Sequence, residues 1–346
     1  MQRPGILYAL VSAALFGVSA PLAKILLGQT SPWLLAGLLY LGSGLGLAVA
    51  RPFLPRDEAK LQRRGLPWLG AAILAGGVIG PVLLRFGLAQ GAAGATSLLL
   101  NLESVLTLLI AWVVFRENVD SRLLVGAAAI VAGAVILSWP APETGGTGLS
   151  AALLVAGACL AWAIDNNLTR KVSAADPVVI AMVKGLIAGA VNTAIALGTG
   201  AHFPGSGTIA AAALLGFFSY GVSLTLFVFA LRYLGTARTG AYYALAPFIG
   251  AGTAILLLHE PVTLGFVAGG MLMAIGLWLH LTEQHQHRHE HEPMEHEHMH
   301  VHDQHHRHDH PSGTPPEPHS HPHRHPRMVH KHAHYPDIHH RHSHSH

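Results

Sequence analysis

GATSLLLNLESVLTLLIAWVVFRE, residues 94–117, is an apolar run with one acid, Glu103, near its middle and another, Glu117, at its end. The hydrocarbon core of a bilayer is about 30 Å thick, and roughly 20 apolar residues cross it as a helix. An ionised carboxylate at mid-depth is costly, so it is expected only where it has a partner or a function. The run therefore predicts a membrane helix that carries a candidate functional acid.

A second copy of this pattern lies 143 residues further along the chain. When Glu117 is aligned with Glu260, the segment GAYYALAPFIGAGTAILLLHE at 240–260 matches the first run without a gap, and LES at 102–104 falls opposite LAP at 245–247. A repeat at this separation indicates two homologous halves within one chain.

The composition also indicates a membrane protein. Hydrophobic residues make up 51% of the chain and charged residues 11%, whereas about 25% charged residues is usual in soluble domains. The first apolar run, 5–27, is longer than the core of a signal peptide, so we interpret it as the first span. The single cysteine, Cys159, lies in an apolar run, which excludes a disulfide scaffold and a cysteine metal cluster.

The apolar runs predict an all-α membrane protein with ten transmembrane helices. A first repeat of five spans occupies residues 1–138, a linker 139–148 and a second repeat of five spans 149–282, before a tail at 283–346. Because five is odd, the second repeat enters the membrane from the opposite side, which makes the two repeats inverted. The predicted spans are 5–27, 32–50, 67–89, 93–115, 122–138, 149–169, 177–198, 208–231, 239–258 and 261–281.

Basic residues in the connections predict the orientation. Eleven Lys and Arg residues lie in the connections after spans 2, 4, 6 and 8, and none lies in those after spans 1, 3, 5, 7 and 9. Short loops rich in Lys and Arg stay in the cytoplasm, so we expect both termini to be cytoplasmic and the 139–148 linker to be periplasmic. The chain is then a multi-pass protein of the cell inner membrane.

Three segments resemble the drug/metabolite transporter superfamily, in particular proteins built of two EamA-like domains. They are AALFGVSAPLAK at 13–24, the first run extended to 94–119, and ALRYLGTARTGAYYALAPFIGAGTAILLLHEPVT at 230–263. The resemblance covers about residues 5–281. It implies a ten-helix carrier with a central cavity between the repeats, working by alternating access and often exporting small metabolites, but it implies no substrate.

The first-half candidates for a transport site surround Glu103. On a continuous helix Thr96, Glu103 and Thr107 fall within one stripe, and Asn101 lies on the same span. Arg85, on the neighbouring span, lies at a depth from which it could reach Glu103. Two interpretations are open: a coupling or substrate-binding carboxylate, and a structural ion pair that locks spans 3 and 4 together.

The second-half candidates lie in WAIDNNLTRK at 162–171, which places Asp165 and Asn166 about one turn inside the cytoplasmic end of span 6. Lys184 lies two turns into span 7, at a similar depth. Asp165 and Lys184 are therefore expected to pair if both face the bundle. The pair has two interpretations, a structural or gating contact and direct contact with substrate.

Span 9 adds aromatic residues and a proline. Tyr242 and Tyr243 either line a cavity for an aromatic or amphipathic solute or serve in packing. Pro247 removes a backbone hydrogen bond, which predicts a kink and a potential hinge. In the family a proline also occupies the first-half position, where this chain has Ser104, so we expect the kink in the second half only. Glu117 and Glu260, at span ends, are expected to cap or position helices.

The tail contains 24 histidines in its 64 residues and few aliphatic residues. Too little apolar surface is available to offset chain entropy, so we predict disorder. Neutral imidazole binds Zn, Ni and Co, and the tail is either a cytoplasmic metal buffer or sensor or a solvated segment with incidental metal affinity. The candidate ligands are His285, His287, His289, His291, His296, His298, His300 and His302.

Three classes of function compete. The favoured one is a secondary, non-ATP transporter of a small organic metabolite; the second is a transition-metal transporter or metal-regulated carrier; the third is a membrane sensor or scaffold. Outside the tail, histidines occur only at 202, 259 and 280, at span ends or in loops, which argues against a metal path. The sequence has no phosphate loop, nucleophile elbow or HExxH motif, so we expect no enzyme, no required cofactor and no nucleic-acid partner.

Overall fold

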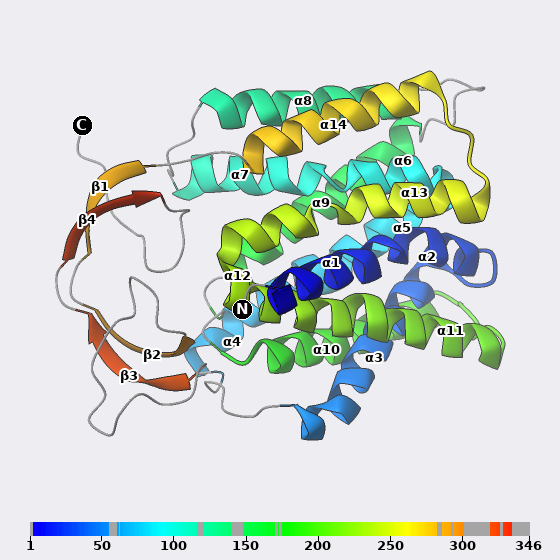
Figure 1. Cartoon of the computed structure of the whole chain (residues 1–346). Coiled ribbons are helices and arrows are strands. Elements are labelled where there is room, and N and C mark those ends of the chain that lie inside the picture. The colour runs from blue at the N-terminus through cyan, green and yellow to red at the C-terminus, as the bar shows by residue number, and fades with distance from the viewer. Residues whose placement is uncertain are drawn as a thin grey trace.

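The computed structural model describes residues 3–54, 61, 63–115, 121–139, 148–169, 172, 175–281, 286–291, 294–300, 319–325 and 328–333. Its body is a bundle of long helices that run roughly parallel and antiparallel to one another (Figure 1). Within the described residues nine stretches are long and apolar enough to cross a membrane, and the apolar helix Ala246–Leu258 is shorter. The predicted multi-pass helical fold is confirmed.

The first half contains the five predicted spans, three of them built from more than one helix. Span 1 is divided at Val18, span 3 contains a π-helix, η3, and span 4 is divided at Leu100 and Asn101. The elements are α1 (Arg3–Gly17), α2 (Ser19–Leu27), α3 (Pro32–Ala50), η1 (Arg51–Phe53), η2 (Arg63–Gly65), α4 (Leu66–Ala72), η3 (Ile73–Ile79), α5 (Gly80–Gln90), α6 (Ala93–Leu99), α7 (Leu102–Phe115) and α8 (Ser121–Ser138).

The second half repeats this arrangement, again with a π-helix, η4, in its third span. The elements are α9 (Leu149–Thr169), α10 (Pro177–Gly198), α11 (Ser206–Gly216), η4 (Phe217–Val222), α12 (Ser223–Tyr243), α13 (Ala246–Leu258) and α14 (Leu264–Leu281). The predicted break between spans 8 and 9, at 232–238, is wrong, because helical backbone continues to Tyr243. No proline lies in that segment, and the chain breaks only at Ala244 and Leu245, just before Pro247.

The fourth span of each half is broken next to the aligned triplet, before it in the first half and at its first residue in the second. The breaks fall at Leu100–Asn101 and at Ala244–Leu245, so the expectation of a kink in the second half only is wrong. In the first half the Ser104 hydroxyl donates to the Asn101 carbonyl at 2.7 Å, which stabilises the turn without a proline. In the second half Pro247 lies in the first turn of α13, where proline is tolerated.

Helix packing follows the inverted repeat. Corresponding helices pack on each other, α3 on α10, α6 on α13 and α8 on α14, and α1 packs on α12 as α9 packs on α5. The α8–α14 pair is seen at the top of Figure 1. These contacts are those of two halves related by an approximate two-fold axis, as the inverted repeat predicts.

Glycines bring α8 and α14 into close contact. A Cβ added at Gly133 would lie 2.7 Å from the Gly269 carbonyl oxygen, and one added at Gly276 would overlap the Gly126 carbonyl oxygen. Small residues of this kind let membrane helices approach backbone to backbone. The crossing is reciprocal, because Gly126 and Gly133 are the repeat counterparts of Gly269 and Gly276.

The structure describes four short segments of the tail, and each of them is a strand. β1 (Gln286–His291) pairs antiparallel with β4 (Met328–Ala333), and β2 (Met294–His300) pairs antiparallel with β3 (His319–His325). The physical reason lies in the sequence, where histidine recurs at every second position and so follows the two-residue period of a strand. Antiparallel pairing also supplies hydrogen-bond partners for the backbone N–H and C=O groups of these segments.

Candidate transport site

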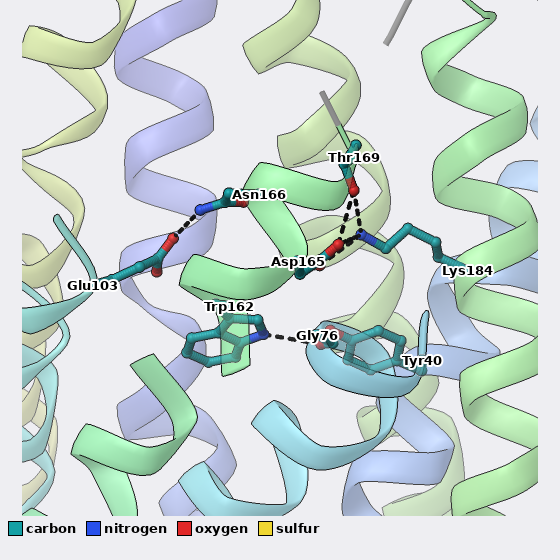
Figure 2. A network of polar contacts seen from close by, with 8 residues as sticks. All are labelled: Tyr40, Gly76, Glu103, Trp162, Asp165, Asn166, Thr169 and Lys184. Carbon is teal, nitrogen blue, oxygen red and sulfur yellow. Dashed lines mark hydrogen bonds and ion pairs between the residues drawn. The ribbon is translucent and has the colours of Figure 1, made fainter. Parts of the chain in front are cut away.

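Helix α9 carries polar residues on two of its faces. On one face Cys159 and Asn166 are seven residues apart, and the Cys159 thiol lies 3.7 Å from the Leu99 carbonyl oxygen of α6. On the same face the Asn166 amide donates to Glu103 Oε1 at 2.7 Å. Figure 2 shows this contact on one side of α9, away from Asp165. Glu103 is thus held by an amide of the second repeat and remains partly exposed.

On the other face of α9, Asp165 pairs with Lys184 of α10, as the sequence predicts. Lys184 Nζ lies 2.6 Å from each carboxylate oxygen of Asp165, and the Thr169 hydroxyl donates to Oδ1 at 2.8 Å (Figure 2). The Asp165 residue is 6% exposed. Two contacts from Lys184 and one from Thr169 therefore compensate the charge of a carboxylate that is nearly removed from solvent.

The π-helix η3 lies against this ion pair and is held by side chains from other helices. The Gly76 carbonyl accepts hydrogen bonds from Trp162 Nε1 at 2.9 Å and from the Tyr40 hydroxyl at 3.0 Å. The Gly77 carbonyl accepts one from the Asn192 amide at 3.0 Å. Because a π-helix shifts the normal backbone pairing, such donors can satisfy carbonyls that the helix leaves available.

Gly76 also sets the distance between η3 and α9. A Cβ at this position would overlap the Asp165 carboxylate. Tyr40 and Asn192 belong to the same network, although the sequence pattern did not predict it. Each is a polar residue within an apolar span, a signal that was available.

Arg85 is completely buried in α5. Its Nη2 donates to the Tyr220 hydroxyl, and its Nε and Nη1 have no hydrogen-bond partner among the described residues. The structural ion pair between Arg85 and Glu103, one of the two interpretations of these residues, is not formed, since the two side chains have different partners. The prediction assumed a straight span 4, whereas the break at Leu100–Asn101 starts a new helix in which Glu103 faces α9.

The same break interrupts the predicted stripe. Thr96 lies on α6, is fully buried and has a hydroxyl without a partner in the described part of the chain, whereas Glu103 and Thr107 share α7 and are partly exposed. The Asn101 amide donates to the Leu98 carbonyl at 2.8 Å and so closes the end of α6. Glu103 and Thr107 therefore remain together, and Thr96 does not share their helix.

Aromatic residues fill the space between the repeats. The Tyr220 ring of η4 lies 5.4 Å from the Tyr40 ring and 5.9 Å from the Phe16 ring. Tyr243 lies 5.6 Å from Phe16 and 4.7 Å from Phe227, measured between ring centroids. Tyr242, also at the end of α12, is partly exposed. Tyr243 thus joins α12 to α1 through the aromatic cluster of Phe16, Tyr220 and Phe227.

Two charged residues fasten the turn between α5 and α6. Both oxygens of Glu260 accept from backbone N–H groups at the start of α6, Ala93 at 2.6 Å and Gly94 at 2.7 Å. Lys24 donates to the Leu88 and Gly91 carbonyls at the end of α5. Each charge opposes the partial charge of the helix end that it contacts. The capping role predicted for Glu260 is confirmed, and Glu117 lies outside the described residues.

The tail histidines can be placed by register alone. His285 and His302 lie outside the described residues, and the other six candidates lie in β1 and β2. The pairing sets five histidines opposite five others: His287 with His332, His289 with His330, His296 with His323, His298 with His321, and His300 with His319. Outside the tail, the described residues contain no group of three or more His, Cys, Asp or Glu that could hold a metal ion.

These features define the class of the protein: a multi-pass helical membrane protein made of two inverted five-helix repeats, with charged groups at their contact. The family model of the EamA-like transporter family matches the chain twice, over residues 3–139 and 149–282. The chain belongs to the EamA-like transporter family and is a membrane transporter by that membership.

Similar proteins agree with this assignment. An "Uncharacterized transporter" of Methanothermobacter thermautotrophicus is 27% identical over 80% of this chain and 85% of its own length. The "Uncharacterized transporter YvbV" of Bacillus subtilis is 25% identical over 78% of this chain and 88% of its own length. A solved structure titled "Crystal structure of protein" superposes with a TM-score of 0.58 over 80% of this chain and 95% of its own, at 16% identity, and supports the fold alone.

Proposed function

We propose that this protein is a secondary transporter that exports a small organic metabolite by alternating access, without ATP. The observation that carries the proposal is the set of charged contacts on α9, where Asn166 binds Glu103 and Asp165 binds Lys184. Buried ionisable groups in membrane spans usually serve substrates, ions or protons. In an inverted repeat, transport sites lie at the contact between repeats and next to broken helices.

The geometry supports a division of roles between the two carboxylates. Asp165 accepts from Lys184 and Thr169 and is nearly buried, so it holds α9 to α10. Glu103 has one neutral partner, Asn166, and is partly exposed. It is therefore the acid available to exchange its partner for a proton or a solute when the repeats move relative to each other.

Replacing Glu103 with glutamine tests this assignment. Glutamine keeps the carbonyl oxygen that accepts from Asn166 but cannot ionise, so we expect solute flux in cells or proteoliposomes to fall at least tenfold while the protein accumulates normally. Glu260→Gln is the matched control, because that acid caps α6 rather than facing α9. Normal flux in Glu103→Gln, or loss of folded protein in place of loss of flux, would contradict the coupling role.

The orientation that we propose places both termini in the cytoplasm of the cell and the protein in the inner membrane. Its support is the distribution of eleven basic residues over alternate connections. Reporter tags at residues 2 and 346 should both give a cytoplasmic signal. A periplasmic signal from either tag would refute the proposed orientation.

A second candidate function concerns transition metals, and the opposed histidines of the tail strands favour it. We propose that the cytoplasmic tail binds Zn²⁺, Ni²⁺ or Co²⁺ and adjusts transport by the body, since a cytoplasmic segment has no route across the bilayer. Truncation after Glu283 should leave organic-solute flux intact and remove its response to metal. If metal flux alone disappeared with the tail, the metal-transporter alternative would replace the organic one, and no flux of either kind would favour a sensor or scaffold.

A further inference from the structure

Arg85 is a buried cation for which the described part of the protein supplies no counter-ion. It has no exposed surface, and within the described residues its Nε and Nη1 have no partner. Its hydrogen bond to the described residues goes to the neutral hydroxyl of Tyr220. A guanidinium stays charged at any physiological pH, and an uncompensated charge inside a membrane protein is strongly unfavourable.

The carboxylates of the described body are all engaged elsewhere. Between residues 3 and 281 the structure describes four: Glu103 binds Asn166, Asp165 binds Lys184, Asp176 binds Arg51, and Glu260 caps α6. Moving any of them to Arg85 would break the hydrogen bond or ion pair that it makes in this structure. A bound anion could therefore neutralise Arg85 without breaking any of these contacts.

The fold itself does not need a cation at this place. The repeat counterpart of Arg85 in the second half is Val228. The same helix position is thus compatible with an apolar side chain, and the guanidinium is a departure from the repeat. A buried charge inside the membrane that the other repeat replaces with an apolar residue is a candidate ligand-binding group.

The surroundings of Arg85 indicate the kind of ligand. Arg85 belongs to the first repeat and its partner Tyr220 to the second, so the group lies where the two repeats meet. Tyr220 packs against the rings of Tyr40 and Phe16. A planar guanidinium with free N–H donors matches a carboxylate, and the neighbouring rings suit an apolar body.

We infer that Arg85 binds the carboxylate of the transported solute, and that the solute is a monocarboxylate with an apolar body. This inference rests on the proposed transport function and specifies its substrate class. Binding then supplies the counter-ion that Arg85 lacks, and release returns Arg85 to its uncompensated state.

Ligand-dependent stability of the purified full-length protein tests the inference directly. The probes are pairs of similar shape in which a neutral amide replaces the carboxylate: acetate and acetamide, butyrate and butyramide, 3-phenylpropionate and 3-phenylpropanamide, with chloride as the inorganic anion. We expect at least one carboxylate to raise Tm by several degrees at millimolar concentration, while its amide and chloride do not. Equal shifts within every pair, no shift from any carboxylate, or the same shift from chloride would overturn the inference.

Substitution of Arg85 adds a second criterion. In Arg85→Gln the carboxylate shift should disappear, and the ligand-free Tm should rise by about 2 to 4 °C, because an uncompensated charge has been removed. Lys24→Gln removes a cation that binds the Gly91 carbonyl at the end of α5, outside this group, and should retain the shift. A carboxylate shift that persists in Arg85→Gln would overturn the inference, and if that variant does not accumulate, the wild-type comparison of acids and amides decides.

Flux measurements separate this inference from the proposed function. Flux of a neutral or cationic solute that Arg85→Gln leaves unchanged would overturn the carboxylate site and keep the transporter. A carboxylate-specific Tm shift without flux of any solute would keep the site and overturn the proposed export.

Discussion

The π-helices η3 and η4 occupy corresponding positions in the two halves, yet different side chains hold them. In η3 the Gly76 and Gly77 carbonyls accept from Trp162, Tyr40 and Asn192, which lie on three other helices. In η4 the Gly221 carbonyl accepts from the hydroxyl of Thr225, one turn further along the same run of helix. The repeat thus reproduces the backbone feature, whereas the side chains around it have diverged.

The charged groups diverge in the same way. Each of the four in the centre of the bundle has an apolar counterpart in the other half. Asp165 corresponds to Leu22, Lys184 to Leu41, Glu103 to Ala246 and Arg85 to Val228. The inverted fold is therefore compatible with apolar residues at all four positions. At each of them only one of the two repeats carries the charged residue.

The largest loss of stability should come from removing one partner of the ion pair between Asp165 and Lys184. Lys184→Leu introduces the residue found at the corresponding first-half position, but it leaves Asp165 buried with the Thr169 hydroxyl as its remaining side-chain donor. We expect the free energy of unfolding in detergent to fall by about 3 to 5 kcal/mol.

The double variant Asp165→Leu with Lys184→Leu is the control for this prediction. It recreates the apolar arrangement of Leu22 and Leu41 and should recover most of the lost stability, since a well-packed apolar pair can replace a buried ion pair. A double variant as unstable as Lys184→Leu would mean that the pair is required by the fold.

A methyl group at Gly76 should have the next largest effect. Its Cβ would overlap the Asp165 carboxylate, so Gly76→Ala should push η3 away from α9 and lower the unfolding free energy by about 2 to 3 kcal/mol. Ser219 is the corresponding residue in η4 and already carries a Cβ. Ser219→Ala should therefore change stability by less than about 1 kcal/mol, and equal losses at the two positions would contradict the difference between η3 and η4.

Removing one hydroxyl that donates to a carbonyl of each π-helix should give a smaller difference in stability. Tyr40→Phe deletes the hydroxyl that bonds to the Gly76 carbonyl from another helix, at an expected cost of about 1 kcal/mol. Thr225→Val deletes the local bond to the Gly221 carbonyl and should cost less, about 0.5 kcal/mol or below. Thermal unfolding of both variants under one condition makes the comparison, and a larger loss for Thr225→Val would reverse it.

A small effect is also expected where the two halves already agree in shape. Ser104→Pro gives the first half the proline of its second-half counterpart, Pro247. The helix is already broken at Leu100–Asn101, and the substitution removes the hydroxyl and N–H bonds to the Asn101 carbonyl. We expect a change in unfolding free energy below about 1 kcal/mol and unaltered flux, whereas a large loss would show that the hydroxyl is needed for the turn.

The sequence predicted those features that depend on local composition. Apolar run length located the spans, and the 143-residue offset identified the repeat. Similar depths in neighbouring spans were sufficient for the contact between Asp165 and Lys184. In each case the prediction needed only position along a helix, which sequence determines well.

Features that depend on helix direction were not predictable in this way. The pairing of Arg85 with Glu103 assumed a straight span 4, and the break at Leu100–Asn101 removed that assumption. The boundary after span 8 followed polar residues, whereas the chain turns at Ala244–Leu245, before Pro247. The bonds from Tyr40 and Asn192 depend on where η3 leaves carbonyls available, and no sequence pattern marks a π-helix.

The reciprocal glycine contact between α8 and α14 has an evolutionary consequence. A crossing in which Gly126 meets Gly276 and Gly133 meets Gly269 is the pattern of an isologous dimer. Each half therefore carries a surface suited to an upside-down copy of itself. The two members of each contact are encoded by separate codons and can mutate independently, while the contact constrains them as a pair.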